Sequence, residues 1–218
     1  MPQRTDLLTA IARMATDLAP DRIVRFAIDG VDGAGKTSFA NELADVLGGF
    51  GRPAIRASVD SFHNPRAVRY ARGRQSPIGF YEDSYNYALL KRYLLDPLSP
   101  GGSGRYCIAA FDHVTDSAVP LVGRTALPNS ILLLDGIFLH RPELRAYWDA
   151  SIFLRVDFTM SAARSAGRDG TSPDPSAESN RRYVEGQRIY LSECAPEKHA
   201  TMVIDNNDLA APFVVAKR

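Results

Sequence analysis

The stretch Gly30-Val31-Asp32-Gly33-Ala34-Gly35-Lys36-Thr37 fits the pattern G-x-x-x-x-G-K-[ST], which is typical of a loop that binds phosphate groups. The apolar run at 23–28 predicts a buried strand before it, and apolar residues at helical spacing in 38–47 predict a helix after it. Glycines let successive backbone N–H groups point into one concavity, to which the helix N-terminus adds positive potential. This context argues against the alternative, a glycine-rich turn without function. We therefore predict a phosphate site formed by Gly30, Asp32, Gly33, Ala34, Gly35, Lys36, Thr37 and Ser38.

Predicted strands and helices alternate along the chain, which indicates an α/β fold with a doubly wound parallel sheet. We expect strands at 23–28, 54–59, 131–135, 151–156 and 202–205, and helices at 5–19, 38–47, 84–95, 159–169 and 179–191. Residues 64–82 are expected to form a loop, while 106–111 is strand-like and 119–127 is expected to pair near it. With 218 residues and no evident linker, we expect a single P-loop domain, 1–218, with an N-terminal helix within 1–20 and a lid at about 164–190.

The composition bounds the partners that we expect. The net charge of +1 creates no global field that favours nucleic acid or an anionic membrane. No apolar run reaches the roughly 18 residues of a membrane span, and the first six residues lack the apolar core of a signal peptide. Cys107 and Cys194 lie outside any metal-ligand spacing. We expect a cytoplasmic protein that binds neither nucleic acid nor membrane, and we leave a homo-oligomer open.

Two carboxylates follow predicted strands, at the sheet edge where the phosphate loop is also expected. Asp60 could act as a general base or hold Mg²⁺ through water, the alternative being a cap on the next turn. Asp135 closes an apolar run, as a Mg²⁺-binding strand-end acid does, and the alternative is a solvent-facing strand end. Lys36 would reach the outer phosphates, and the Thr37 hydroxyl could ligate Mg²⁺. We therefore predict a metal site of Thr37, Asp60 and Asp135.

Arginines in the C-terminal half of the chain suggest a lid. Arg164 and Arg168 are four residues apart on one predicted helix face and precede a segment rich in Gly, Ser and Pro. Closure of such a lid would bring guanidinium groups over the phosphates, whereas the alternative is a solvated helix face. Arg181 and Arg182 are weaker candidates of the same kind. The arginine cluster within 66–74 is either a site for an anionic acceptor or, as we prefer, a solvated loop.

The phosphate loop, Asp60-Ser61-Phe62, residues 80–85, the strand 131–135 with Gly136-Ile137-Phe138, and the arginine lid resemble uridine kinase in order and spacing. They are also similar to phosphoribulokinase and bacterial pantothenate kinase, and the resemblance covers about residues 24–206. It implies ATP–Mg²⁺-dependent phosphorylation of an alcohol, commonly the 5′-hydroxyl of a nucleoside.

The resemblance also implies roles for particular residues. Asp60 matches the catalytic base, Asp83 matches the acid that holds ribose hydroxyls, and Arg164 and Arg168 match lid arginines. We therefore expect the catalytic residues Asp60, Lys36 and Arg168, with Arg164 on the nucleotide. The expected acceptor contacts are Asp60, His63, Tyr81, Asp83, Phe111, Arg168 and Gln187.

Three departures from uridine kinase bear on the acceptor and the metal. The chain has Phe111-Asp112-His113 and Asp116 where uridine kinases carry Tyr-Asp-Phe and a nearby His, and His63 replaces the usual Tyr. Asp135 stands where those kinases often have Glu. We expect a small-molecule acceptor with a hydroxyl group, most simply a nucleoside, with another ribosyl compound, a sugar phosphate or a pantothenate-like alcohol as alternatives. The other hypothesis is that the protein is not a kinase but an ATP-dependent switch or a regulatory protein without catalysis.

Overall fold

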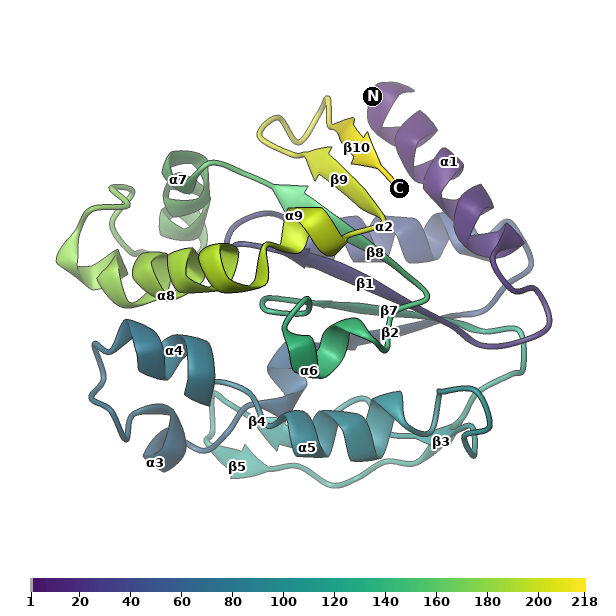
Figure 1. Cartoon of the computed structure of the whole chain (residues 1–218), viewed down its shortest axis with the longest axis horizontal. Helices are drawn as coiled ribbons and strands as arrows, with labels where there is room; N and C mark the ends of the chain where they lie inside the picture. The colour runs from purple at the N-terminus through teal and green to yellow at the C-terminus, as the bar shows by residue number, and fades with distance from the viewer. Residues whose placement is uncertain (1) are drawn as a thin grey trace.

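The computed structural model describes residues 2–218, except for the side chains of Pro2 and Asp169. Its centre is a six-stranded sheet in the order β10-β9-β8-β1-β7-β2, in which only β10 runs antiparallel to its neighbour (Figure 1). This arrangement confirms the predicted α/β class. The strands of the sheet are β1 (Val24–Gly30), β2 (Ala54–Ser58), β7 (Ile131–Gly136), β8 (Ala150–Arg155), β9 (Met202–Asp205) and β10 (Phe213–Lys217).

Helices cover both faces of the sheet, because its central strands are apolar on both sides. Val24, Phe26 and Ile28 of β1 pack on one face, whereas Ala27 joins the other core, as alternation along a strand requires. The first face is covered by α1 (Pro2–Asp17) and α2 (Lys36–Gly48). The second is covered by α5 (Tyr87–Leu90), η2 (Lys91–Leu95), α6 (Pro142–Arg145) and the end of α8 (Glu178–Cys194).

The segment between β2 and β7 differs most from the sequence-based expectation. Residues 64–82 are not all loop, because they include α3 (Arg66–Arg69) and most of α4 (Pro77–Asp83), which Ser76 caps through Gly79 N–H. The helix expected at 84–95 begins only at Tyr87 and continues as the π-helical η2. The expected strand at 106–111 is replaced by two short pairs: β3 (Arg105–Tyr106) with β6 (Arg124–Thr125), and β4 (Phe111–Asp112) with β5 (Ser117–Ala118).

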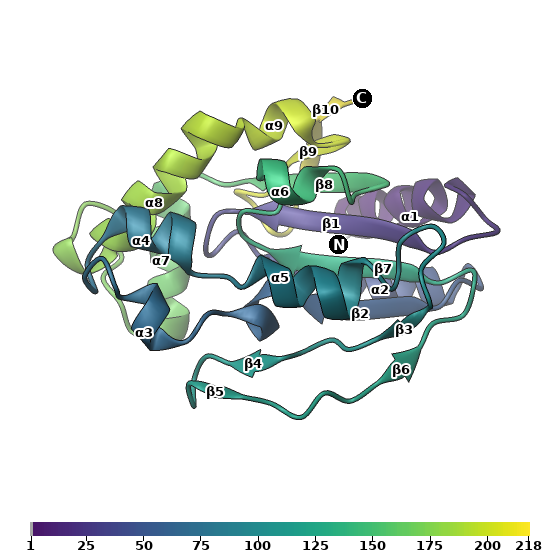
Figure 2. The ribbon, with the colours of Figure 1, turned by 60° about the horizontal axis from the view of Figure 1, so that its bottom comes forward.

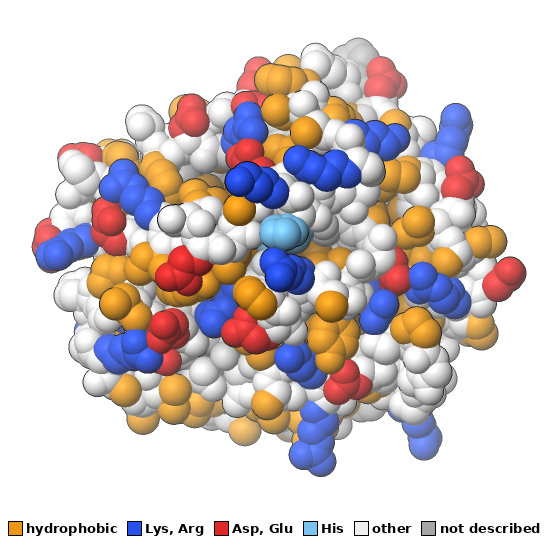
Figure 3. Space-filling model, in the orientation of Figure 1, with side chains coloured by type: hydrophobic (Ala, Val, Ile, Leu, Met, Phe, Trp, Pro, Cys, Tyr) orange, Lys and Arg blue, Asp and Glu red, His pale blue; other side chains and the backbone are white. Residues whose placement is uncertain are grey.

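Two further elements, α6 and α9 (Pro196–His199), and the edge strand β10 were not expected from the sequence. None of the helices in residues 2–218 is both long enough and apolar enough to cross a bilayer. Acidic and basic side chains are interspersed over the face in Figure 3. This mixture fits the near-neutral net charge.

The sheet order brings the candidate residues to one edge. β1, β7 and β2 are neighbours, and Asp135 is in register with Ile28 on one side and Ser58 on the other. The phosphate loop follows β1, and Asp60 lies in the short helix η1 (Val59–Phe62) after β2. Helices α7 (Phe158–Asp169) and α8, with α3 and α4, lie beyond this edge (Figure 2).

Candidate functional site

The loop between β1 and α2 has the conformation that phosphate binding requires. Gly33 and Gly35 have φ angles of 66° and 84°, in the left-handed region that favours glycine. A Cβ atom on Gly33 would lie 2.5 Å from the carbonyl oxygen of Ser161, so this position also needs glycine for space. Lys36 Nζ donates to the carbonyl of Val31 at 2.8 Å, within the loop itself.

A cavity of about 360 Å³, here called the P-loop cavity, opens over this loop. Its wall contains most of the residues predicted to bind the nucleotide and the metal. Gly30 and Ala34 are not in its wall; the Ala34 carbonyl instead accepts a hydrogen bond of 2.7 Å from Asn206 Nδ2. The wall is formed by Asp32, Gly33, Gly35, Lys36, Thr37, Ser38, Asp60, Tyr85, Asp135, Gly136, Ile137 and Arg168.

The strand-end acid Asp135 lies next to the loop threonine. Thr37 Oγ1 donates to Asp135 Oδ2 at 2.7 Å, and Asp135 is 2% exposed. Arg56 Nη2 donates to the other carboxylate oxygen at 2.7 Å. Sequence reasoning missed Arg56, because its partner is 79 residues away and only the pairing of β2 with β7 places the two together.

The donor set at this point suits a hard divalent cation. Thr37, Asp135 and Asp60 all line the P-loop cavity and all carry side-chain oxygen atoms, and oxygen is the ligand that Mg²⁺ prefers. Within residues 2–218, no group of three or more His, Cys, Asp or Glu side chains could hold a metal alone. A Mg²⁺ ion here would therefore keep water and phosphate oxygens in its coordination shell, as Mg²⁺ commonly does.

A second cavity of about 420 Å³, here called the neighbouring cavity, adjoins the first. The two share five wall residues, which are Asp32, Asp60, Tyr85, Ile137 and Arg168. Asp60 and Arg168 therefore lie on the border between the cavities. A small molecule in the neighbouring cavity would reach Asp60 and, across it, the space above the phosphate loop.

Tyr85 holds the Asp60 carboxylate. The Tyr85 hydroxyl donates to Asp60 Oδ1 at 2.9 Å. Burial, and then the charge of Asp60, raise the pKa of Tyr85 well above its usual value, so its hydroxyl stays protonated as a donor. Only one carboxylate oxygen of Asp60 is used in this bond, which leaves the other for a ligand.

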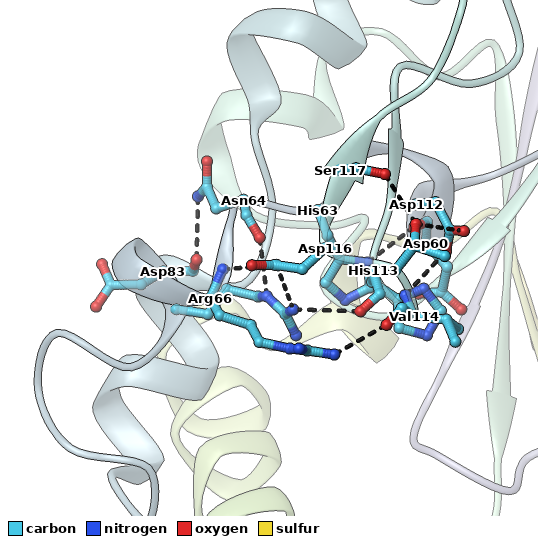
Figure 4. A network of polar contacts seen from close by, with 12 residues as sticks. Asp60, His63, Asn64, Arg66, Asp83, Asp112, His113, Val114, Asp116 and Ser117 are labelled. Carbon is cyan, nitrogen blue, oxygen red and sulfur yellow. Dashed lines mark hydrogen bonds and ion pairs between the residues drawn. The ribbon is translucent and has the colours of Figure 1, made fainter.

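His63 forms the adjoining wall of the neighbouring cavity. Its Nδ1–H donates to the carbonyl of Asp60 at 2.8 Å, and its ring centroid lies 4.7 Å from that of His113 (Figure 4). The ring centroid of Tyr85 lies 4.6 Å from that of His63. Burial lowers the pKa of His63, which favours a neutral ring at neutral pH. His113, which the sequence analysis singled out only as a departure, also lines this cavity.

Three predicted acceptor residues are not brought to either cavity wall. Tyr81 is buried, with its hydroxyl oxygen 3.2 Å from Cys194 Sγ, because adjacent helical residues point in different directions and Phe80 takes the cavity side. Asp83 lies 3.2 Å from Arg72 Nε, and Figure 4 shows its carboxylate pointing away from Asp60. Phe111 is buried in β4.

The two lid arginines are placed differently. Arg168 lines both cavities, as expected for a group above the phosphates. Arg164 lies in neither wall and donates instead to the carbonyls of Gly33, Asn206 and Asn207 at 3.3, 3.0 and 2.6 Å. Burial lowers the pKa of Arg164. Its position supports the phosphate loop from outside the cavity rather than over the phosphates.

Gln187 connects helix α8 to the phosphate loop. It is 2% exposed, its Oε1 accepts the Asp32 N–H at 2.6 Å, and its Nε2 donates to Asp32 Oδ2 at 3.3 Å. Gln187 also lines the neighbouring cavity, where it was expected. One helix thus contacts both the loop and the space beside it.

A buried network that the sequence analysis did not identify lies behind the loop. Asp29 is fully buried and accepts hydrogen bonds from His140 Nδ1 at 2.6 Å and from the Tyr190 hydroxyl. His140 Nε2 lies 2.9 Å from Ser151 Oγ. These residues come from β1, β8, α8 and the segment after β7, so no local pattern in the sequence could reveal them.

The comparisons with known proteins agree with this fold and loop. The model of the Phosphoribulokinase / Uridine kinase family matches residues 26–180. No curated protein matches the chain by sequence. A candidate uridine kinase from Bacillus stearothermophilus is 21% identical with a TM-score of 0.71, over 93% of this chain and 97% of that chain. A candidate fructose transport system kinase from Silicibacter sp. TM1040 is 24% identical with a TM-score of 0.67, over 87% and 94%.

Phosphoribulokinase from Rhodobacter spheroides is a more distant likeness, at 13% identity and a TM-score of 0.55, over 85% of this chain and 70% of that chain. At these identities the solved structures show a shared fold. The family model, in contrast, covers well over half of the chain and includes the phosphate loop, Asp60, Asp135 and Arg168. The chain belongs to the Phosphoribulokinase / Uridine kinase family.

Proposed function

We propose that this chain transfers the γ-phosphoryl group of ATP, as its Mg²⁺ complex, to a hydroxyl group of a small molecule. The observation that carries the proposal is the position of Asp60 on the border that the P-loop cavity and the neighbouring cavity share. Such transfer needs a nucleotide site and an acceptor site that meet at one carboxylate.

The proposed roles follow from the contacts of each residue. Tyr85 engages only Oδ1 of Asp60, so Oδ2 can accept the proton of the acceptor hydroxyl or orient that hydroxyl for attack. Lys36 would leave the carbonyl of Val31 to contact the outer phosphates. Arg168, on the shared border, would stabilise the charge on the transferring group.

A bound Mg²⁺ would neutralise charge on the phosphates. Thr37 would hold it directly, and Asp135 and Asp60 through water, with Thr37 Oγ1 already oriented by Asp135. Helices α7 and α8 would act as the lid, because Arg168 and Gln187 contact the space that must close around the reactants. Closure would exclude water and suppress hydrolysis of ATP.

A nucleoside is the acceptor that the family resemblance favours. A different acceptor, such as a sugar phosphate, another ribosyl compound or a pantothenate-like alcohol, is the second candidate. A specific observation supports this second candidate: Asp83, which matches the acid for ribose hydroxyls, is paired with Arg72 and lies outside the neighbouring cavity.

The test is ADP release with Mg-ATP against nucleosides, ribosyl compounds, sugar phosphates and pantothenate. We expect at least one class to stimulate release. We expect Asp60→Asn to lower that stimulated rate by about 10²- to 10⁴-fold while ATP still binds. Asp45→Asn, an exposed acid on α2, is the matched control. ATP binding without transfer to any acceptor would favour a switch or a regulatory protein, and normal turnover by Asp60→Asn would remove Asp60 as the base.

A further inference from the structure

Arg182 of α8 is a buried cation in the wall of the neighbouring cavity. It is 5% exposed, and its guanidinium lies 4.9 Å from the ring centroid of Tyr70 and 5.6 Å from that of Phe80. Its Nη1 and Nη2 donate to the carbonyls of Arg74 and Arg69 at 2.7 and 3.3 Å. Among the residues whose side chains are described, no acid forms an ion pair with Arg182.

Another buried arginine shows what a purely structural role looks like in this chain. Arg52 is 4% exposed, also has no acid partner among the described side chains, and is absent from the walls of both cavities. It donates to six backbone carbonyls, of Ala15, Thr16, Leu18, Ala19, Arg22 and Asn129. Arg182 has only two such bonds for five N–H donors, and it faces a cavity.

The charges around the neighbouring cavity are unevenly placed. Its two acids, Asp32 and Asp60, both lie on the border with the P-loop cavity. The rest of its described wall holds Arg69 and Arg182 and no Asp or Glu. Asp116, which is 3.3 Å from Arg69, is outside that wall. A molecule in this cavity would therefore meet Asp32, Asp60 and Arg168 at the border, and the guanidinium groups of Arg69 and Arg182 away from it.

A buried cation is costly unless an anion or several hydrogen bonds compensate it. Burial is the largest influence on the pKa of Arg182 and lowers it, as expected for a guanidinium without a carboxylate partner. The planar guanidinium fork matches the oxygen pair of a phosphate or carboxylate, and the donors that Arg182 leaves unused can supply that match.

We propose that the neighbouring cavity takes an acceptor that carries an anionic group, a phosphate or a carboxylate, which Arg182 binds with help from Arg69 while the hydroxyl of the acceptor lies at Asp60. The proposal rests on the proposed kinase function, and it names the chemical class of the acceptor. An uncharged nucleoside would leave the Arg182 guanidinium without a counter-ion.

A binding experiment tests the anion site without turnover. The protein is saturated with Mg²⁺ and a non-hydrolysable ATP analogue, so that the phosphate loop is filled, and is then titrated calorimetrically with inorganic phosphate or with acetate. We expect one of these anions to bind wild type, and about 10- to 100-fold weaker binding by Arg182→Met. Arg188→Met, an exposed arginine on the same helix paired with Glu185 at 2.8 Å, should bind as wild type does.

The phosphate and acetate arms distinguish the two kinds of anion. Affinity for the ATP analogue shows that each variant is folded. If Arg182→Met is unstable, Arg182→Lys replaces it in the test; this variant keeps the charge and should retain part of the anion binding. Failure of both anions to bind the wild-type complex, or equal binding by Arg182→Met, would overturn the proposal.

A kinetic experiment separates this proposal from the kinase proposal. ADP release is measured with uridine and ribose as uncharged acceptors, ribose 5-phosphate as a phosphate acceptor, and pantothenate as a carboxylate acceptor. We expect stimulation by an anionic acceptor, with a KM that rises about 10- to 100-fold in Arg182→Met. Stimulation by uncharged acceptors alone would overturn the anion site and keep the kinase function. Anion binding that depends on Arg182, without any ADP release, would keep the site and count against the kinase function.

Discussion

Thr37 and Asp135 are joined by a hydrogen bond of 2.7 Å, from Thr37 Oγ1 to Asp135 Oδ2, although 98 residues separate them in the chain. The bond orients the loop hydroxyl, and Arg56 holds the second carboxylate oxygen at 2.7 Å. Asp135 is therefore fixed from both sides, next to the hydroxyl that we propose as a ligand of Mg²⁺.

We expect Asp135→Asn to raise the Mg²⁺ concentration that the reaction needs, because the variant keeps the size of the side chain and loses its charge. Loss of an outer ligand commonly costs about 10- to 100-fold in metal affinity or activity. The measurement is the rate of ADP release against Mg²⁺ concentration at saturating ATP. Asp45→Asn serves as the control, and an unchanged Mg²⁺ titration would contradict the role of Asp135.

Gln187→Glu should weaken ATP binding. The change puts a carboxylate where the Gln187 amide now donates to Asp32 Oδ2 at 3.3 Å, so that two like charges would face each other beside the phosphate loop. We expect the Kd for ATP to rise about 10- to 100-fold at pH 8, because a buried hydrogen bond to the Asp32 carboxylate is lost. Lower pH should restore part of the affinity as the new carboxyl takes up a proton. Gln75→Glu, in an exposed loop, should bind ATP normally. Similar ATP affinities for the two variants would show that the contact between Gln187 and Asp32 does not affect nucleotide binding.

His140→Phe should destabilise the fold. The substitution removes the 2.6 Å hydrogen bond to Asp29, which is fully buried, and leaves the Ser151 hydroxyl without its ring partner. Breaking one side of a buried pair costs about 3–5 kcal/mol, which urea unfolding at pH 7 would measure. His199→Phe, on the exposed end of α9, is the control and should change the free energy of unfolding by less than about 0.5 kcal/mol. A loss below about 1 kcal/mol for His140→Phe would show that the network carries little stability.

Features encoded by neighbouring residues were predictable. The phosphate loop, the central strands and the long helices follow from a local motif and from hydrophobic spacing, and the structure contains them within a few residues. The segment 64–127 was not predictable to the same degree. Its helices and hairpins are short, and caps such as Ser76 and Asn86 decide where they begin.

The candidate site divides in the same way. Lys36, Thr37, Asp60 and Asp135 are placed by the ends of parallel strands, so the order of elements alone predicts that they share an edge. Tyr81 and Phe80 are adjacent in the sequence, and only the packing of α4 decides that Phe80 lines the neighbouring cavity while Tyr81 contacts Cys194.

The sequence by itself therefore determined the α/β class, the phosphate loop and the carboxylates at the strand ends, because each depends on local pattern or on strand order. Tertiary structure alone decided that Arg164 supports the loop from outside, that Asp83 pairs with Arg72, and that Arg182 is buried in the wall of the neighbouring cavity. The physical reason is that the partner and the exposure of a long charged side chain are set by residues far away in the chain, which come together only when the helices dock.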